Sequence, residues 1–129
     1  MNRVIRVLVA NQPRLMREMV VATLTDQPDM EIVGEVTDDA EISSQVTKIL
    51  PDLVVISLDD SGKRPVLCDT ILRKHPEVRI IAVASQTNDA VFYWASFNIH
   101  SNEIESSEEG ILSAARGISA DAPGSLGAN

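Results

Sequence analysis

A serine stands where a buried strand of this chain reaches its carboxyl end. Residues 52–58 read Asp-Leu-Val-Val-Ile-Ser-Leu, an apolar run that meets Ser57 near its tip. In an open parallel sheet, ligands bind and chemistry takes place beyond the carboxyl ends of the strands. A carboxylate there would bind a metal ion or accept a phosphoryl group, but Ser57 carries no charge and no strong base stands beside it. The pattern therefore indicates the position of a site without its chemistry.

Alternating strand and helix signals surround this position. Apolar, β-branched runs predict strands at residues 4–10, 30–36, 53–58 and 78–84, with a weaker strand at 98–104. Helical spacing, caps and prolines predict five helices. The first runs from Pro13 to before Pro28, the second from Asp38 or Asp39 to Leu50, and the third over 66–74. The fourth runs from Thr87 or Asn88 to about Ser96, and the last from Ser107 to Ile118. The first helix carries its apolar residues at helical spacing: Leu15, Met16, Met19, Val20, Ala22 and Leu24.

The order of these elements predicts an α/β protein. Five alternating βα units favour a flavodoxin-like (βα)5 doubly wound sandwich, with a parallel five-stranded sheet in the order 2-1-3-4-5. Residues 1–118 are expected to form one domain. Residues 119–129, rich in Ala, Gly, Ser and Pro, are expected to be a flexible tail or the start of a linker.

Composition excludes several classes of function. The 129 residues carry a net charge of −8, which argues against direct binding of nucleic acid because the phosphates would be repelled. No apolar run approaches the roughly 20 residues of a membrane helix, and no signal peptide is evident, so a cytoplasmic location is expected. The single cysteine, Cys68, is expected to be buried on a helix rather than reactive, and no cluster has metal-ligand spacing.

Several segments, in this order, resemble the receiver domains of bacterial two-component response regulators, in particular the subgroup that usually precedes a helix-turn-helix DNA-binding domain. The segments that carry the resemblance are Ile5-Arg-Val-Leu-Val-Ala10, Pro13-Arg-Leu-Met-Arg-Glu18, Pro28-Asp-Met-Glu-Ile-Val-Gly-Glu35, Pro51-Asp-Leu-Val-Val-Ile56 and His75-Pro-Glu-Val-Arg-Ile80. The resemblance covers residues 3 to about 118 and implies the fold predicted above.

The resemblance also implies phosphoryl transfer, for which this chain lacks the groups. Receivers use two acids that hold Mg²⁺, a nucleophilic aspartate, a hydroxyl and a lysine. Here the acidic pair falls on Asn11 and Gln12, the nucleophile on Ser57, the hydroxyl on Ala84 beside a serine, and the lysine near Ile104; no lysine follows residue 74. Without carboxylates Mg²⁺ binds weakly and phosphoryl transfer lacks its main electrostatic stabilisation. We therefore expect a degenerate, non-enzymatic receiver with no cofactor and no metal.

Other interpretations of the same positions stay open. Asp59 or Asp60, just past the strand end, would serve as a displaced phosphoacceptor if the alignment shifts by two or three residues. Ser57 would be a substrate for a serine kinase. Asn11, Gln12 and Ser57 together would hold waters or a small ligand, which makes a small-molecule sensor the third class of function.

All four aromatic side chains lie in one stretch: Phe92, Tyr93, Trp94 and Phe97. On a helix, three of these rings would share a face, either filling the core beside the weak fifth strand or forming an exposed anchor for a partner. The interface interpretation predicts binding of a protein partner, or a homodimer, through residues 88–118. The expected function is thus a phosphorylation-independent interaction module in bacterial signalling or transcriptional control. Whether the natural chain continues into a DNA-binding domain is left open by the sequence.

Overall fold

The computed structural model describes residues 3–59, 61, 63–87, 89–96 and 98–120. The strands are β1 (Ile5–Val9), β2 (Met30–Glu35), β3 (Leu53–Leu58), β4 (Arg79–Ala84), β5 (Asp89–Ala95) and β6 (Ile99–Glu105). The helices are α1 (Arg14–Thr25), the short 3-10 helix η1 (Asp39–Glu41), α2 (Ile42–Ile49), α3 (Val66–Lys74) and α4 (Glu108–Ala120). The sheet has the order β2-β1-β3-β4-β5-β6, so the flavodoxin-like fold is confirmed, with an extra strand.

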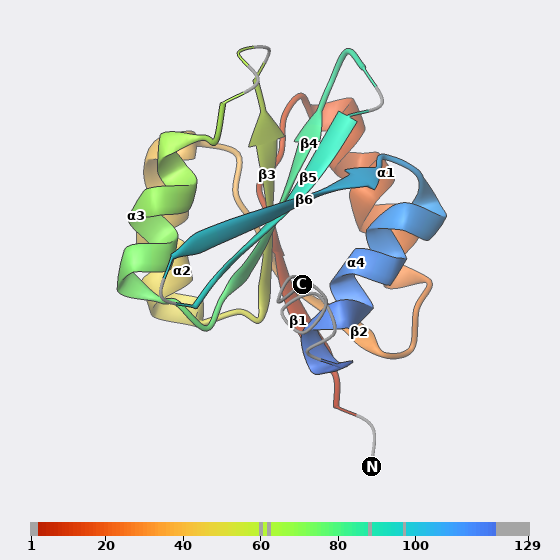
Figure 1. Cartoon of the computed structure of the whole chain (residues 1–129). Coiled ribbons are helices and arrows are strands. Elements are labelled where there is room, and N and C mark those ends of the chain that lie inside the picture. The colour runs from red at the N-terminus through yellow and green to blue at the C-terminus, as the bar shows by residue number, and fades with distance from the viewer. Residues whose placement is uncertain (1–2, 60, 62, 88, 97, 121–129) are drawn as a thin grey trace.

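The first four strands are parallel and lie between two layers of helices. Helices α1 and α4 cover one face of the sheet and α2 and α3 the other (Figure 1). In β3, the side chains from Leu53 to Ile56 are almost fully buried, as expected for a strand that is covered on both faces. This arrangement places the carboxyl ends of β1 and β3 side by side, because the two strands pair directly.

Residues 89–95 form a strand, so the helix predicted from Thr87 or Asn88 to Ser96 is wrong. β5 runs antiparallel to β4, and β6 runs antiparallel to β5, so β6 has the same direction as β4. The predicted five-stranded parallel sheet is thus a mixed sheet of six strands. The residue types explain the difference, because the run from Val91 to Trp94 is β-branched or aromatic throughout and such residues favour strands.

The strand β5 contributes to the cores on both faces of the sheet. Phe92 and Trp94 pack with α4 and α1, whereas Tyr93 packs on the side of α3. This alternation follows from the period of two along a strand. The hairpin of β5 and β6 is therefore part of the folded domain and not an appendage.

Helix α1 buries a different stripe from the one that its apolar residues predict. Leu15 is 68% exposed and Met19 is 56% exposed, so these two apolar residues lie outside the buried stripe of the helix. The buried residues of α1 are Arg17, Val20 and Leu24, at spacings of three and four. A charged residue thus occupies one position of the buried stripe.

The connection between β6 and α4 is tight. Helix α4 begins at Glu108, as predicted, and the Ser107 hydroxyl accepts a hydrogen bond from the Gly110 amide at 3.1 Å. A Cβ atom on Gly110 would collide with the backbone carbonyl oxygen of Glu105. Glycine at this position therefore allows the helix to approach the end of β6 closely.

Candidate functional site

Ser57 lies at the end of β3 and is bound to the loop that follows β1. Its hydroxyl oxygen accepts a hydrogen bond from the backbone amide of Gln12 at 2.7 Å, and it lies 3.5 Å from the Gln12 carbonyl oxygen, to which it donates. The hydroxyl is thus engaged in both directions with one residue. Ser57 therefore holds the β1–α1 loop against the end of β3.

The side-chain amide of Gln12 is hydrogen-bonded through both its nitrogen and its oxygen. Its Nε2 donates to the carbonyl oxygen of Thr37 at 2.7 Å, and its Oε1 accepts from Nη1 of Arg17 at 2.9 Å. The first bond fixes the loop after β1 to the segment that follows β2. The second directs the amide oxygen, the atom that would otherwise be free for a cation, onto a guanidinium.

Arg17 brings a permanent positive charge to this place. Its side chain is almost buried, at 7% exposed, and Nη1 also donates to the backbone carbonyl oxygen of Asn11 at 3.4 Å. Its Nε lies 3.6 Å from a carboxylate oxygen of Glu35, at the end of β2. At an effective dielectric constant of 20, two unit charges 4 Å apart interact by about 4 kcal/mol, so a divalent cation would be repelled strongly here.

The sequence interpretation missed the role of Arg17, although a signal for it exists. Arg17 shares the buried stripe of α1 with Val20 and Leu24 and lies only five residues after Gln12. An arginine on a buried helix stripe needs acceptors nearby, because a buried charge is costly unless it is paired. The acceptors that the structure supplies come from positions 11, 12 and 35.

Asn11 is fully buried, at 0% exposed, beneath this cluster. Neither its Oδ1 nor its Nδ2 has a hydrogen-bond partner within the part of the chain that the structure describes. A buried amide without partners costs about 1–3 kcal/mol. The structure thus brings together Asn11, Gln12 and Ser57, as the sequence predicts, and adds one unsatisfied amide to them.

The two remaining positions of the predicted site, Ala84 and Ile104, behave differently. Ala84, the last residue of β4, pairs with Leu58 and offers only a methyl group, while Ser85 after it is exposed. Ile104 lies on β6, where it pairs with Ala90. Because β4 and β5 separate β6 from β3, Ile104 is displaced by three strand spacings, or about 14 Å, from the end of β3. Position 104 does not join the cluster.

The acidic loop after β3 has its own local bonds. One carboxylate oxygen of Asp59 accepts from the Ser61 amide at 2.9 Å and from the Ser61 hydroxyl at 2.6 Å. These bonds hold the pKa of Asp59 below its ordinary value. Asp60 lies outside the described residues. Asp59 is exposed, and its bonds run along its own loop rather than toward Ser57.

The aromatic side chains lie in the core. Phe92, Tyr93 and Trp94 are 1%, 5% and 8% exposed, so on this chain they are not exposed anchors, and the alternative that they fill the core fits the structure. The rings of Phe92 and Trp94 stack with their centroids 5.7 Å apart, and Trp94 stacks on His100 at 5.2 Å. Phe97 lies outside the described residues.

The sequence also makes predictions about the cysteine, about metal ligands and about membrane helices. Cys68 is buried on α3, as predicted, and burial raises the pKa of its thiol to about 12, so the reactive thiolate is suppressed. Among the described residues, no group of three His, Cys, Asp or Glu side chains is placed to hold a metal ion. None of the described helices is long and apolar enough to cross a bilayer.

Sequence comparison relates the chain to response regulators. No protein-family model matches it. The protein-glutamate methylesterase/protein-glutamine glutaminase of Thermotoga maritima is 28% identical over 88 residues, which are 68% of this chain and 26% of that protein. The DNA-binding transcriptional activator DevR/DosR of Mycobacterium tuberculosis is 27% identical over 86 residues, which are 66% of this chain and 40% of that protein. The match thus spans less than half the length of each relative.

Solved structures give the same relation. The response regulator domain of Thermotoga maritima CheB superposes with a TM-score of 0.54 and 29% identity, covering 64% of this chain and 62% of that one. The signal receiver domain of the response regulator NarL from Mycobacterium tuberculosis has a TM-score of 0.55 at 23% identity, with 66% and 69% of the two chains covered, and supports the fold alone. By sequence and fold together, this chain is similar to the response-regulator receiver domains of two-component signal transduction.

Proposed function

We propose that the chain is a phosphorylation-independent receiver domain, which acts as a non-enzymatic protein-interaction module in signal transduction or transcriptional control. Its relatives include a methylesterase with a response regulator domain and a DNA-binding transcriptional activator. Since this chain spans only part of those proteins, their catalytic and DNA-binding activities are not carried over to it.

The observation that carries this proposal is the bond between Arg17 and Gln12. In a receiver with chemistry, the loop after the first strand presents negative charge to Mg²⁺. Here Gln12 Oε1 and the Asn11 carbonyl oxygen receive hydrogen bonds from a guanidinium that is always charged. A fixed internal cation at this loop would oppose the binding of Mg²⁺, because like charges repel.

The nucleophile position supports the same proposal. Ser57 Oγ accepts the amide proton of Gln12 and donates to the carbonyl of the same residue, so attack on phosphorus would break both bonds. No described base contacts the Ser57 hydroxyl to remove its proton. The lysine position, Ile104, is apolar and lies on another part of the sheet. The residues at the metal-binding, nucleophile and lysine positions thus all differ from those that phosphoryl transfer requires.

We place partner recognition on the surface of residues 88–118, where the chain departs most from the receiver pattern. The three buried rings do not contribute an exposed anchor, so the described surface of this region is formed mainly by β6 and the outer face of α4, with Asp89 of β5 also exposed. Self-association is the second way in which this region could act, and we assign it to the outer face of α4. Direct contact with nucleic acid is not part of the proposal, because the net charge of −8 would repel phosphates.

One observation favours a second candidate, a small-molecule sensor. Asn11 buries both polar atoms of its amide without a partner among the described residues, and such an amide would gain hydrogen bonds from a small polar ligand or from water. The nearby loop would have to open for entry, because Asn11 is fully buried. A shift in melting temperature with a small polar compound, lost in Asn11→Leu, would support this candidate.

The test of the main proposal is titration with beryllofluoride in the presence of Mg²⁺, observed by fluorine NMR. A receiver that accepts a phosphoryl group forms a stoichiometric adduct with a bound fluorine signal. We expect no bound signal for this chain. A bound signal that disappears in Asp59→Asn would overturn the proposal in favour of the displaced phosphoacceptor, and one that disappears in Ser57→Ala would restore chemistry to the strand end.

A further inference from the structure

Among the described residues, no strand pairs with the outer edge of β6, the last strand of the sheet. β6 pairs with β5 over seven consecutive residue pairs, from Ile99–Ala95 to Glu105–Asp89, and contains neither proline nor glycine. In Figure 1, β6 crosses the front of the molecule with no described helix or strand in front of it. Since alternate residues of an edge strand direct their N–H and C=O groups away from the sheet, this edge offers a ladder to another chain.

Three acidic residues gather on one face of the hairpin. Glu105 lies directly opposite Asp89, and Glu103 is the next residue of β6 on the same face. All three are exposed, and within the described residues none of them forms an ion pair. Like charges placed directly opposite each other destabilise a sheet. This arrangement therefore costs stability in the free domain and leaves negative charge available to a partner.

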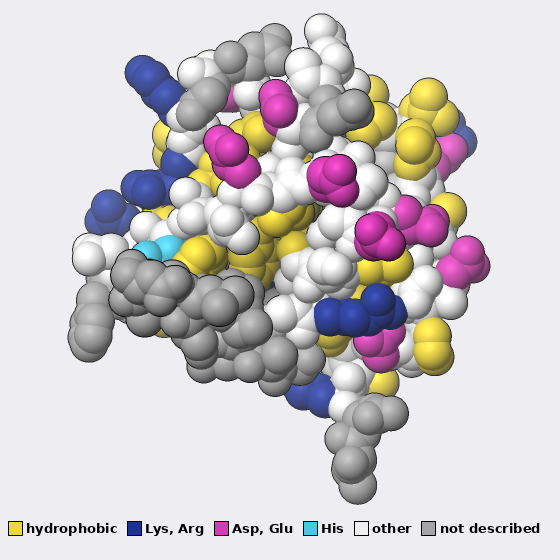
Figure 2. Space-filling model, turned by 45° about the vertical axis from the view of Figure 1, so that its right-hand side comes forward, with side chains coloured by type: hydrophobic (Ala, Val, Ile, Leu, Met, Phe, Trp, Pro, Cys, Tyr) yellow, Lys and Arg dark blue, Asp and Glu magenta, His cyan; other side chains and the backbone are white. Residues whose placement is uncertain are grey.

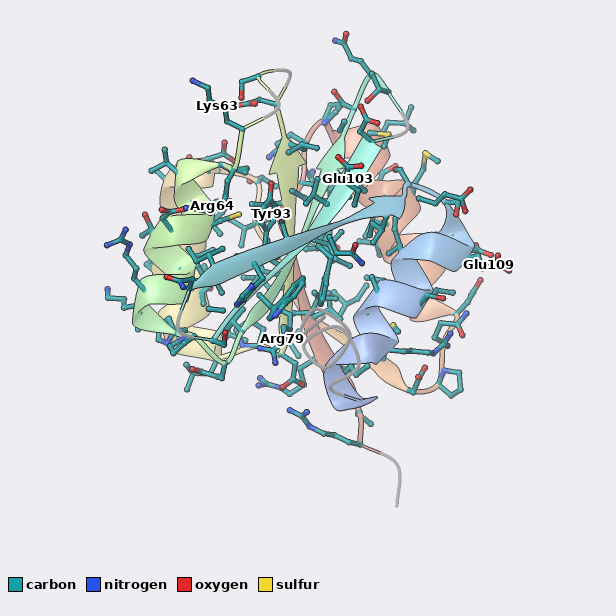
Figure 3. All side chains as sticks on the ribbon, viewed as in Figure 1. Lys63, Arg64, Arg79, Tyr93, Glu103 and Glu109 are labelled. Carbon is teal, nitrogen blue, oxygen red and sulfur yellow. The ribbon has the colours of Figure 1, made fainter. Side chains whose placement is uncertain are left out.

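A pocket lies beside these acids. It has a volume of about 240 Å³, and its lining includes Asp89 and Glu103 together with Val91 and Tyr93. Two carboxylates beside apolar and aromatic walls fit a lysine or arginine side chain, whose stem packs on apolar surface while its cationic end remains near the acids. Figure 3 shows Glu103 and Tyr93 close to one another in this part of the molecule.

The surface around this end of β6 is also negatively charged. Figure 2 shows acidic side chains across the upper and right-hand part of this side of the molecule, with apolar side chains visible between them. The first turn of α4 adds Glu108 and Glu109. A second copy of this chain would bring a further charge of −8 to the same edge, whereas a basic segment would neutralise it.

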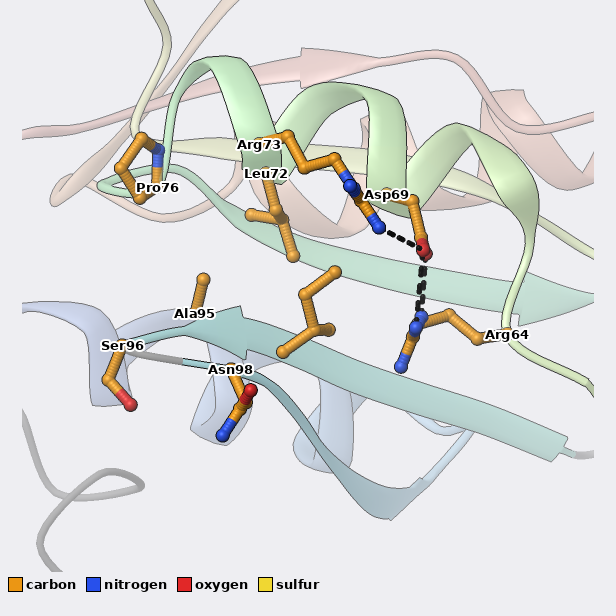
Figure 4. A pocket seen from close by; sticks show the side chains of 9 residues that line it. Arg64, Asp69, Leu72, Arg73, Pro76, Ala95, Ser96 and Asn98 are labelled. Carbon is orange, nitrogen blue, oxygen red and sulfur yellow. Dashed lines mark hydrogen bonds and ion pairs between the residues drawn. The ribbon is translucent and has the colours of Figure 1, made fainter.

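The other end of the hairpin differs in charge. A cleft of about 590 Å³ between α3 and Ile99 is lined by Arg64, Asp69 and Arg73 (Figure 4). Asp69 is already paired there, with Arg64 at 2.7 Å and with Arg73 at 3.8 Å. No unpaired acid lies in the described lining of this cleft, so a basic side chain of a partner belongs at the Asp89 end and not at this one.

We propose that β6 binds an extended peptide segment of a protein partner by strand addition, with lysine or arginine at alternate positions directed at Asp89, Glu103 and Glu105. The backbone ladder of β6 supplies the main-chain hydrogen bonds, and the acidic pocket selects the side chains. This inference rests on the proposed function as an interaction module, for which it names the partner chemistry. Its test is independent of the beryllofluoride titration, so the two can fail separately.

The experiment titrates the whole chain with a seven-residue peptide of alternating lysine and valine, by calorimetry and by amide hydrogen exchange. We expect saturable one-to-one binding and slower exchange of the amides of residues 99–105. A peptide with glutamate in place of lysine is expected not to bind. A lysine peptide that is N-methylated at alternate residues is expected to lose binding in one of its two methylation patterns, because only one pattern blocks the ladder.

Two double variants distinguish binding at the acidic pocket from a general attraction between the basic peptide and the acidic protein. Asp89→Asn/Glu103→Gln is expected to weaken binding about tenfold, whereas Asp39→Asn/Glu41→Gln, which removes the same charge from exposed positions on η1, is expected to change it less than about twofold. Equal losses in the two variants, or no saturable binding, would overturn the proposal. Concentration-dependent dimers that protect residues 99–105 without peptide would overturn it as well, by assigning the edge to a second copy.

Discussion

The ends of β1 and β3 differ from the β5–β6 hairpin in how each departs from the receiver pattern. At the first region the backbone follows the predicted order of strands, and only the side chains differ: Gln12 bonds to Ser57, and Arg17 donates to Gln12 Oε1 and to the Asn11 carbonyl oxygen. At the second region the backbone itself differs, because a strand replaces a helix. In the first region polar side chains bond within the domain, whereas in the second region a strand edge is exposed at the surface.

The two regions also differ in how readily other molecules are expected to bind them. Around Asn11, Gln12 and Ser57 most polar groups are bonded within the domain. The buried side-chain atoms there without a hydrogen bond among the described residues are the amide of Asn11 and Nε of Arg17, which lies 3.6 Å from Glu35. At the hairpin, the edge of β6 and the carboxylates of Asp89, Glu103 and Glu105 remain without ion-pair partners among the described residues. Carboxylates without an ion pair on an exposed strand are available for binding, although one oxygen of Asp89 accepts a hydrogen bond from the Thr87 hydroxyl at 2.9 Å, whereas satisfied buried groups stabilise the fold.

The largest expected effect tests whether the hairpin belongs to the core. Phe92→Ala removes a ring that is 1% exposed and stacks on Trp94, so we expect the free energy of unfolding to fall by about 3–5 kcal/mol. Urea denaturation measures this loss. Leu15→Ala, at a position that is 68% exposed, serves as the control and is expected to change stability by less than about 0.5 kcal/mol. Similar small losses for both variants would mean that β5 is peripheral.

The next effect concerns the internal cation. Arg17→Met removes the donor to Gln12 Oε1 and to the Asn11 carbonyl oxygen, and we expect a loss of about 1–3 kcal/mol in urea denaturation. Arg14→Met is the matched control on the same helix, since Arg14 is 82% exposed and pairs only with Glu18 among the described residues. If Arg17→Met is more stable than the parent chain, the guanidinium would destabilise the fold at this site rather than stabilise it.

A third variant tests how closely α4 is tied to β6. Gly110→Ala places a methyl group against the Glu105 carbonyl oxygen, so we expect a loss of about 1–3 kcal/mol as the helix start shifts. Gly117→Ala, later in α4, is expected not to destabilise the domain, because alanine favours a helix. Thermal unfolding compares the two variants. Equal behaviour would show that the β6–α4 connection tolerates a side chain.

The smallest effect has the opposite sign. Glu105→Gln removes one of two like charges that face each other across β5 and β6, and we expect stability to rise by about 0.2–1 kcal/mol. The gain should shrink in high salt, because exposed charges are screened. Glu41→Gln, on η1, is the control and is expected to give no such salt-dependent gain. A loss of stability in Glu105→Gln at low salt would contradict the repulsion between the two strands.

The sequence predicted the parallel half of the fold well and the hairpin poorly, for a physical reason. The strand at 53–58 is apolar on consecutive residues, and only burial on both faces accounts for that pattern. The segment from Asp89 to Ala95 has strand-forming residue types, but aromatic residues at spacings of three and four also satisfy a helix. The order of elements in receivers favoured the helix, and the residue types were the better guide.

The candidate site was predicted in part. Asn11, Gln12 and Ser57 do lie together, because they follow or end neighbouring parallel strands. The position of Ile104 could not be predicted, since an inserted strand moves it away from β3. The role of Arg17 could not be predicted from the apolar spacing of α1, because that spacing includes the exposed Leu15 and Met19 and leaves out the buried Arg17.

The most direct test of the central claim is Mg²⁺ affinity in chains to which the acids have been restored. Two variants carry Asn11→Asp, Gln12→Asp and Ser57→Asp, one with Arg17 and one with Arg17→Met, and isothermal titration measures Mg²⁺ binding to both. If the guanidinium stands where the metal would, binding will be at least about tenfold tighter without Arg17. Equal affinities in the two variants, or Mg²⁺ binding by the unaltered chain, would contradict the account.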